Sequence, residues 1–297
     1  MRFTKPLLAL ALSVLVAAPA AAAPDRAWEE VGRSEIPLLY YQGMTHDEEG
    51  NRYFSGHLGL FRTDPMLTET GRNDDVLGPE IHLTENYNHI GDLSYYDGRL
   101  FLPLECYYPP IGNTCNNGSI GIADPDTLEL DFYVKLDPSE IKKAMWCEVS
   151  PDGSLLWTQE GDDLLAYDMA ELTEANAAPD AEPIHSVVQL PGAVPPSGIT
   201  GATFIGNELF VAGGSEDGGE IYSIDLRTGE SELQTAVEYI GESEGIDDDF
   251  DLRKDAAVLP GSLQYMVQPY NEEGYPTNGV TNGVVYHFEK DHPSPKK

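Results

Sequence analysis

Basic residues are scarce in this chain. Of its 297 residues, 17 are lysine or arginine and 51 are aspartate or glutamate, so the formal net charge is −34. A surface this negative repels polyanions, which excludes nucleic acid and anionic membranes as expected partners. It favours solubility and the accumulation of cations instead.

Long apolar runs are scarce as well. No stretch approaches the ~20 consecutive apolar residues that a membrane-spanning helix needs. The apolar run Leu7–Val16 follows a basic start and precedes the small residues Ala17–Ala23, which is the pattern of an export signal. We therefore expect residues 1–23 to be removed and the mature protein to be periplasmic or secreted, with no membrane span.

Cysteines are few, since the chain has three. Outside the cytoplasm, in an oxidising compartment, we expect a disulfide. Cys106 and Cys115 flank a short loop with two prolines and a Gly-Asn pair, which favours a local bridge and leaves Cys147 as a small buried thiol. A bridge between Cys106 and Cys147 is the alternative that the sequence leaves open.

Helix signals are also sparse, and short strands dominate the pattern. An apolar strand that ends in an acid recurs at Leu58–Asp64, Ser119–Asp124, Asp163–Asp168, Glu220–Asp225 and Gly283–Glu289. The first four copies follow hairpins with turn residues at their tips, namely Glu49-Gly50-Asn51, Asp97-Gly98, Asp152-Gly153 and Gly206-Asn207. Most copies precede one more strand-like segment, so the repeating unit has four strands.

The stretch Asn88–Glu105 shows the start of this unit most clearly. We expect a short strand over His89–Tyr96 and a second strand over Arg99–Glu105. Asp97-Gly98 supplies the tight turn between them, because glycine accepts the positive φ that such a turn requires.

Four-stranded units of this length, repeated radially, are typical of a β-propeller. We predict an all-β fold, a single β-propeller domain over residues 24–297 with five four-stranded blades. Six blades stay open, because Ala256–Gly283 is long enough to contain further strands. The last unit lacks its fourth strand, and we predict that the N-terminal strand Ala27–Ile36 completes this blade and closes the ring.

This pattern resembles the TolB-like propellers and the calcium-dependent gluconolactonase-type propellers. The resemblance rests on the Asp-Gly and Gly-Asn hairpin tips, the strands that end in an acid, and Glu244-Gly245 before an innermost strand. It covers the mature chain as architecture and short motifs as sequence. Such propellers include lactonases, esterases and non-enzymatic binding proteins, so the fold alone does not select an activity.

In a propeller, the segments that enter the innermost strands converge on one face with the loops between second and third strands. We expect a polar, acid-rich site at this channel mouth. The ligand-binding candidates are Gln42, His57, Glu105, Glu160 and Thr200.

Clustered carboxylates repel one another, and a bound cation relieves that repulsion. Oxygen ligands favour Ca²⁺, so we predict a calcium site formed by Asp92, Glu148, Glu244 and Asp247. The alternative is that each acid accepts hydrogen bonds from backbone amides or water.

His89 is the candidate catalytic residue, because a histidine beside a carboxylate can act as a general base near neutral pH. The alternative is a histidine that holds adjacent blades together, and His46 and His57 are weaker candidates for the same role. Gly241–Gly245 matches the nucleophile motif G-x-S-x-G, but no helical pattern follows it, so we interpret the match as fortuitous.

Two functions agree with these observations. The first is an exported monomer that binds a small molecule or protein ligand at the channel mouth, with Ca²⁺. The second is a metal-dependent hydrolase of esters or lactones that uses the same site, with His89 as the base.

Overall fold

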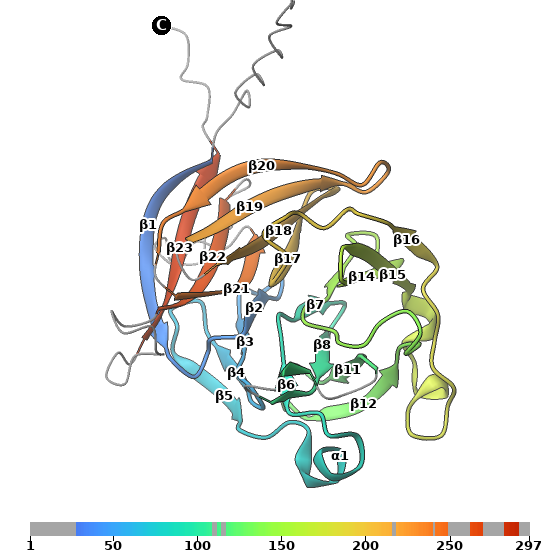
Figure 1. The fold of residues 1–297 in the computed structure, drawn as a ribbon. Coiled ribbons are helices and arrows are strands. Elements are labelled where there is room, and N and C mark those ends of the chain that lie inside the picture. The colour runs from blue at the N-terminus through green and yellow to red at the C-terminus, as the bar shows by residue number, and fades with distance from the viewer. Residues whose placement is uncertain are drawn as a thin grey trace, which may run out of the picture.

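The computed structural model describes residues 28–108, 112–113, 117–215, 218–239, 241–248, 262–269 and 282–290. The expected export signal, Met1–Ala23, lies outside these residues. The chain folds into five antiparallel sheets arranged around a central axis (Figure 1), so the predicted five-bladed β-propeller is confirmed and the six-bladed alternative is not needed.

Each blade has four strands, counted here from the axis outwards. Blade 1 contains β2 (Gly43–His46), β3 (Arg52–Ser55), β4 (Leu60–Thr63) and β5 (Glu69–Asn73). Blade 2 contains β6 (His89–Ile90) with β7 (Ser94–Tyr96), then β8 (Arg99–Glu105), β11 (Ser119–Ala123) and β12 (Leu130–Lys135). Blade 3 contains β13 (Glu148–Val149), β14 (Leu155–Glu160), β15 (Asp163–Asp168) and β16 (Val188–Leu190).

Blade 4 contains β17 (Gly201–Ile205), β18 (Glu208–Ser215), β19 (Gly218–Asp225) and β20 (Glu230–Val237). Blade 5 contains β21 (Gly241–Asp248), β22 (Ser262–Pro269), β23 (Asn282–Lys290) and finally β1 (Trp28–Pro37). β1 pairs antiparallel with β23 along its whole length, so the N-terminal strand closes the ring as predicted.

The acid that ends each repeated strand has a structural role. The Asp64 carboxylate accepts the backbone N–H groups of Met66 (2.9 Å) and Thr68 (2.8 Å) in the turn that leads to β5. Asp124, Asp168 and Asp225 accept N–H groups two residues further along in the same way. These bonds lower the pKa of Asp64, and the bonds to Arg227 lower that of Asp225 to about 2. Asp64, Asp124 and Asp225 therefore hold the turns that lead to the outermost strands of their blades, and Asp168 caps the 3₁₀ helix Met169–Glu171.

The hairpin tips have the conformation that their sequences predict. Asp97 and Gly98 both have positive φ, 46° and 74°, as a two-residue hairpin turn requires. Gly50, Gly153 and Gly206 also have positive φ. The expected strand His89–Tyr96, however, is divided into β6 and β7, because Asp92 bonds to blade 3 at the break.

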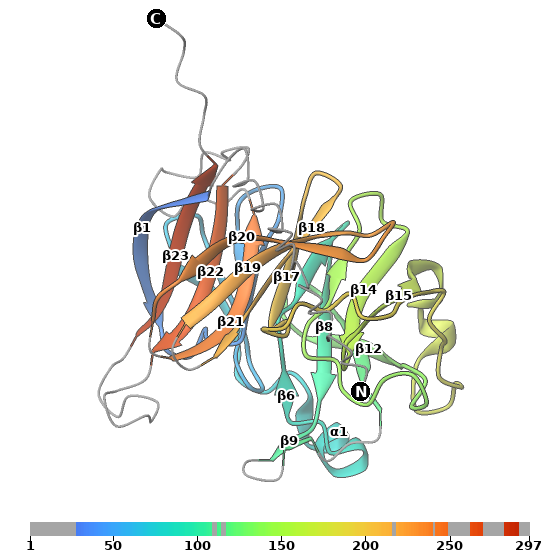
Figure 2. The ribbon, with the colours of Figure 1, turned by 45° about the horizontal axis from the view of Figure 1, so that its top comes forward.

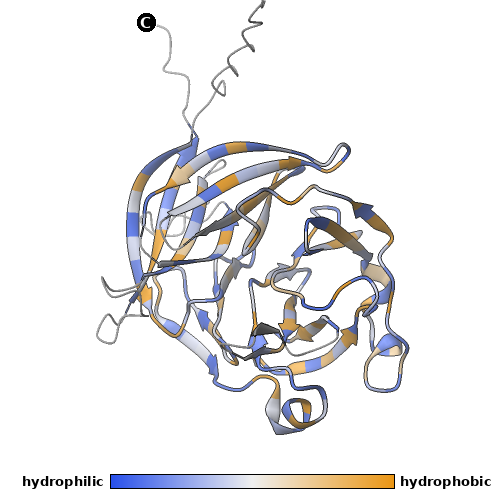
Figure 3. Cartoon of the chain, in the orientation of Figure 1, coloured by the Kyte–Doolittle hydropathy of each residue, from blue (hydrophilic) through white to orange (hydrophobic). Residues whose placement is uncertain are grey.

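Apolar side chains fill the spaces between neighbouring blades. Between blades 3 and 4, for example, Trp157 and Leu164 belong to the same buried cluster as Phe204 and Val211. Figure 3 shows hydrophobic and hydrophilic residues interleaved along the strands, and β8 and β11 are buried along almost their whole length because neighbouring blades cover both of their faces. The hydrophobic core is therefore divided into layers around the axis.

Few elements lie outside the blades. Helix α1 (Gly78–Glu85) connects blades 1 and 2, and β9 (Tyr107–Tyr108) pairs with β10 (Gly112–Asn113). α1 and β9 lie together at one end of the molecule (Figure 2). Two short 3₁₀ helices, η1 (Met169–Glu171) and η2 (Glu174–Asn176), follow β15. Among the described residues, no helix has the length and apolar character needed to cross a membrane.

Candidate functional site

Asp92 connects all five blades at the centre of the ring. Its side chain is fully buried. Oδ1 accepts the N–H of Met44 in blade 1 (3.0 Å), and Oδ2 accepts the N–H groups of Ala202 in blade 4 (3.1 Å) and Ile246 in blade 5 (3.5 Å). The Asp92 backbone forms a parallel bridge with Trp146 in blade 3. Asp92 thereby occupies the middle of the channel with both carboxylate oxygens bonded to the backbone.

Glycines allow the inner strands to close around Asp92. A Cβ atom on Gly43 would lie 2.5 Å from Asp92 Cα, and one on Gly201 would lie 2.5 Å from Asp92 Oδ2. A Cβ atom on Gly245 would overlap Asp92 Oδ1 as well. These positions accept no side chain, so three of the five blades reach the axis through a glycine.

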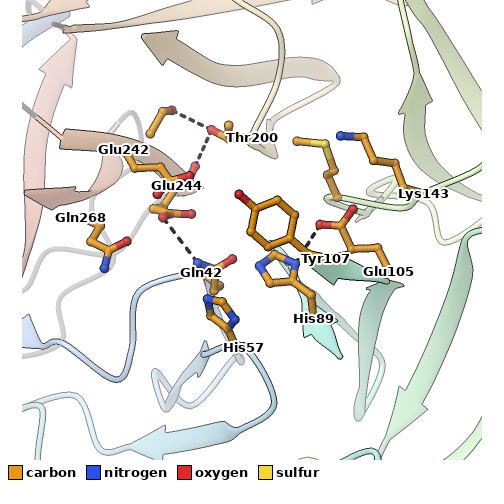
Figure 4. A pocket seen from close by; sticks show the side chains of 13 residues that line it. Gln42, His57, His89, Glu105, Tyr107, Lys143, Thr200, Glu242, Glu244 and Gln268 are labelled. Atoms are coloured by element: carbon orange, nitrogen blue, oxygen red, sulfur yellow. Dashed lines mark hydrogen bonds and ion pairs between the residues drawn. The ribbon is translucent and has the colours of Figure 1, made fainter. Parts of the chain in front are cut away.

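A pocket opens at one end of the channel. It has a volume of about 170 Å³ (Figure 4). The residues that line it come from all five blades and are Gln42, His57, His89, Gly91, Glu105, Tyr107, Lys143, Met145, Thr200, Glu242, Ser243, Glu244 and Gln268. We refer to this cavity as the mouth pocket.

One wall of the mouth pocket is built around His89. Its Nδ1 lies 2.8 Å from Oε1 of Glu105, the residue opposite His89 in the pairing of β6 with β8. The ring of His57 meets the His89 ring edge-on, with centroids 4.9 Å apart, and Tyr107 lies on another side at 5.7 Å. Desolvation and the neighbouring His89 lower the pKa of His57 to about 4, so His57 is neutral at neutral pH.

The facing wall is built around Glu244. Gln42 Nε2 donates to Glu244 Oε1 over 3.5 Å, and Thr200 Oγ1 donates to the Glu244 backbone oxygen over 2.9 Å. Burial, followed by the nearby charges of Glu242 and Asp92, raises the pKa of Glu244 well above its ordinary value. Burial therefore favours the protonated form of Glu244, whose carboxyl group can donate a hydrogen bond.

Figure 4 shows how these two walls face each other. Tyr107 projects between the His89 wall and the Glu244 wall, and Lys143 lies on the same side as Glu105. Gln268 lies beside Glu244 and Gln42. The pocket thus presents hydrogen-bond donors and acceptors on both walls, with an aromatic ring between them.

The structure gathers six predicted site residues in the mouth pocket. They are the base candidate His89, the ligand-binding candidates Gln42, His57, Glu105 and Thr200, and the metal candidate Glu244. Glu160 is not among the lining residues, because its Oε2 accepts the backbone N–H of Lys142 (2.9 Å) and fixes that segment. The metal candidates Asp92, Glu148 and Asp247 are not among the lining residues either.

The four predicted calcium ligands do not form one set. Asp92 has both oxygens bonded to backbone amides, as the alternative interpretation of these acids supposed. Glu148 and Asp247 lie beyond Asp92, since their strands continue past the axis position, away from the mouth pocket that Glu244 lines. Asp247 follows Glu244 by three residues on β21, after the shift in register between Ser243 and Ile246. Asp92 therefore divides the predicted cluster in two.

The far end of the channel holds a second histidine and carboxylate pair. His46 Nδ1, at the end of β2, lies 2.9 Å from Asp247 Oδ2 at the end of β21. Glu148 lies near this pair, and its pKa is raised well above its ordinary value by burial and by the charges of Asp247 and Asp248. His46 was a minor candidate in the sequence, and nothing there placed it beside Asp247.

Lys143, Met145 and Gln268 line the mouth pocket but were not predicted. Gln268 lies near the end of β22, the second strand of its blade, as Glu105 does at the end of β8. The repeat pattern was a signal that could have identified Gln268. Ser243, in the G-x-S-x-G match, also lines the pocket, but it lies within strand β21 rather than on a strand-to-helix turn.

The cysteines agree in part with expectation. Cys147 is buried and its thiol is free, so the alternative bridge between Cys106 and Cys147 is wrong. Cys115 lies outside the described residues, and the Cys106–Cys115 bridge stays a prediction.

Comparison with known proteins supports the fold alone. No family model matches the chain, and no curated protein matches it. Among solved structures, glutaminyl cyclase from Myxococcus xanthus aligns over 90% of this chain and 97% of its own, with 10% identity and a TM-score of 0.55. The PQQ-bound aldose sugar dehydrogenase from Streptomyces coelicolor aligns over 91% and 100%, with 10% identity and a TM-score of 0.44.

The glutaminyl cyclase is a β-propeller, and this chain is a β-propeller of five blades. The resemblance to TolB-like and gluconolactonase-type propellers is confirmed at the level of architecture. At 10% identity the likeness says nothing about the chemistry of the mouth pocket.

Proposed function

We propose that the mouth pocket binds a small polar molecule without net negative charge. The observation that carries this proposal is the pairing of two unlike walls across one cavity of about 170 Å³. The His89 wall presents the Glu105 carboxylate, and the opposite wall presents the Glu244 carboxyl with Gln42. Small-molecule sites commonly combine a concave surface with a few convergent polar groups.

The charges in the pocket favour this class of ligand. Glu105 and Glu242 are acidic and repel anions, and Lys143 supplies one opposing charge. A protonated Glu244, together with the amides of Gln42 and Gln268, offers hydrogen-bond donors to carbonyl or hydroxyl oxygens. The ligand is expected to carry such oxygens and to fit beside the Tyr107 ring.

Calcium is not part of this proposed pocket chemistry. Within the described residues, the group of three or more ligating side chains whose atoms lie within 4.8 Å of one another is at the far end of the channel. The donors of the mouth pocket are mixed with amides and a lysine, which suits a polar organic molecule better than a hard cation.

Calorimetric titration of the exported form of the chain with δ-gluconolactone, glycinamide and citrate tests the proposal. We expect heat of binding with one or both uncharged or cationic probes and none with citrate. Gln42→Ala and Glu244→Ala are expected to weaken binding about tenfold or more, because each removes a polar contact in a buried site. His185→Gln, in an exposed histidine and carboxylate pair on blade 3, is the control. Binding of citrate alone, or equal affinity in all variants, would contradict the proposal.

Ester or lactone hydrolysis is a second candidate, favoured by the His89 and Glu105 pair at an open pocket. In this reaction His89 removes a proton from water as the water oxygen attacks the carbonyl carbon, and Glu105 stabilises the imidazolium. The carbonyl oxygen receives hydrogen bonds from Glu244 and Gln42. The C–O bond then breaks and His89 returns the proton to the leaving alcohol.

Turnover of p-nitrophenyl acetate distinguishes this candidate from binding alone. A hydrolase is expected to lose about 10²-fold or more of its rate in His89→Gln and to keep it in His185→Gln. Activity that survives a chelator would support the metal-free route, and activity lost with the chelator would restore the metal-dependent one. A rate equal to that of buffer in the wild-type chain would leave the pocket as a binding site.

A further inference from the structure

The far end of the channel holds a group of metal-ligating side chains separate from the mouth pocket. His46 ends β2, and Asp247 and Asp248 end β21, the inner strands of blades 1 and 5. One ligand atom from each of these three residues lies within 4.8 Å of the other two. His46 Nδ1 and Asp247 Oδ2 are already 2.9 Å apart.

The charge at this end of the channel favours a cation. Asp247 and Asp248 bring two adjacent carboxylates to the group, and Arg52, which borders the same small cavity as Asp247, is a positively charged neighbour. Carboxylates gathered at a low-dielectric site are costly unless a positive charge compensates them.

Gln264 provides an independent observation. It lies directly opposite Asp247 in the pairing of β21 with β22, and its side chain is 2% exposed. Its Nε2 has no hydrogen-bond partner among the described residues. Gln264 and Asp247 border the same small cavity of about 10 Å³, room for one water. Arg52 borders it too and donates to the backbone oxygen of Pro65.

A buried amide with a free donor beside a carboxylate is typical of the residues that surround a metal ligand. Carboxylate ligands are generally hydrogen-bonded by a neighbouring side chain or water, which fixes their orientation. Gln264 is in position to hold Asp247 in this way through a water in the small cavity that both residues border. The cluster therefore has three ligating side chains and a group to orient one of them.

We propose that His46, Asp247 and Asp248 bind one divalent transition-metal ion at the end of the channel opposite the mouth pocket. An imidazole nitrogen with two carboxylates suits Zn²⁺ or Mn²⁺, whereas Ca²⁺ prefers a shell of six to eight oxygens. Because its ligands come from β2 and β21, the inner strands of blades 1 and 5, the ion also ties blade 5 to blade 1.

Zinc titration of the chelator-treated full chain tests this site. We expect one Zn²⁺ per chain by calorimetry and by elemental analysis after gel filtration, together with a higher melting temperature. His46→Gln and Asp248→Asn are each expected to weaken zinc binding about tenfold or more. The control His185→Gln, which alters an exposed histidine beside Asp137 and Glu140, is expected to bind as the wild type does.

Each outcome decides the proposal. Circular dichroism of the metal-free variants checks that they fold, and Gln264→Leu provides a second test, with a smaller loss of affinity and no loss of a ligand. Equal zinc affinity in His46→Gln, Asp248→Asn and the wild type would overturn the site. Loss of binding only in His185→Gln would assign the zinc to the protein surface, and displacement of zinc by an equal amount of Ca²⁺ would overturn the metal class.

Discussion

The two ends of the channel carry the same pair of groups in different surroundings. At the mouth, His89 Nδ1 lies 2.8 Å from Glu105; at the far end, His46 Nδ1 lies 2.9 Å from Asp247. The mouth pair faces amides, hydroxyls, a lysine and an aromatic ring. The far pair faces two more carboxylates, Asp248 and Glu148.

The difference shows that a histidine beside an acid does not by itself define a function. The groups around the pair decide whether it faces an organic molecule or a metal ion. Asp92 keeps the two surroundings apart, because its carboxylate and its backbone fill the axis between them. Variants that remove Asp92 or disturb its packing are the most direct test of this comparison between the two ends of the channel.

Replacing Asp92 is expected to have the largest effect. Asp92→Ala leaves the buried N–H groups of Met44, Ala202 and Ile246 without their acceptor. Each unsatisfied buried amide costs about 1–3 kcal/mol, so we expect a loss in the free energy of unfolding on the order of 3–5 kcal/mol. Urea denaturation followed by fluorescence measures this loss.

Asp92→Asn is the matched variant for this measurement. It keeps one acceptor oxygen at nearly the same volume, so its loss is expected to be clearly smaller than that of Asp92→Ala. An Asp92→Ala chain within about 1 kcal/mol of the wild type would show that the blades do not depend on this residue.

Gly43→Ala is expected to disturb the packing around Asp92, with a smaller loss of stability than Asp92→Ala. Its Cβ would lie 2.5 Å from Asp92 Cα and 2.9 Å from Gly91 O, both backbone atoms that cannot move aside as a flexible side chain does. We expect a loss of about 1–3 kcal/mol in urea denaturation. Gly71→Ala is the control, because its Cβ would first meet a side-chain atom, Leu128 Cδ1, at 3.3 Å. Equal stability of these two variants would contradict close packing at the axis.

Glu244→Gln is expected to change the pH dependence of stability. The folded-state pKa of Glu244 is raised above its ordinary value of 4.5, chiefly by burial. The folded chain therefore retains a proton that the unfolded chain releases, and this residue's contribution falls as pH rises above about 4.5 towards the raised pKa. Glutamine carries no proton to lose, so the fall in urea midpoint between pH 5 and pH 8 should be smaller in the variant.

Glu242→Gln provides a second variant for this experiment. It removes the neighbouring charge that helps to raise the pKa of Glu244, so it should change the pH profile in the same direction as Glu244→Gln and by a smaller amount. A profile of Glu244→Gln that matches the wild type would show that Glu244 is ionised in the folded chain.

Much of the fold could be predicted because the repeat is local. The strand that ends in an acid recurs since Asp64 and its equivalents bond to amides in the next turn, a contact within four residues. The hairpin tips follow from glycine conformation, and the closing strand follows from counting strands. Helix α1 was missed because it buries none of its residues and so has no apolar face to reveal it.

The site was only partly predictable, because the position of each side chain along the channel depends on how the inner strands of different blades pack together. Sequence placed Glu244 and Asp247 near the axis but could not show that Asp92 would stand between them. The inner strand of blade 2 was read as continuous, so the bridge from Asp92 to Trp146 was not foreseen. His46 lies beside Asp247 only because β2 and β21 meet where the ring closes, a contact across 201 positions of sequence.

Glu160 is expected to give the smallest effect and to mark the boundary of the mouth pocket. It ends β14 as Glu105 ends β8, yet it bonds to the backbone N–H of Lys142 and is absent from the pocket lining. Glu160→Gln keeps an acceptor oxygen for that bond, so we expect a change in stability below about 0.5 kcal/mol and unchanged affinity for the pocket probes. Glu105→Gln, at the equivalent position of blade 2, should weaken probe binding in the same calorimetric assay. Equal loss of binding in the two variants would place Glu160 in the pocket and remove the distinction between its His89 wall and the surrounding acidic rim.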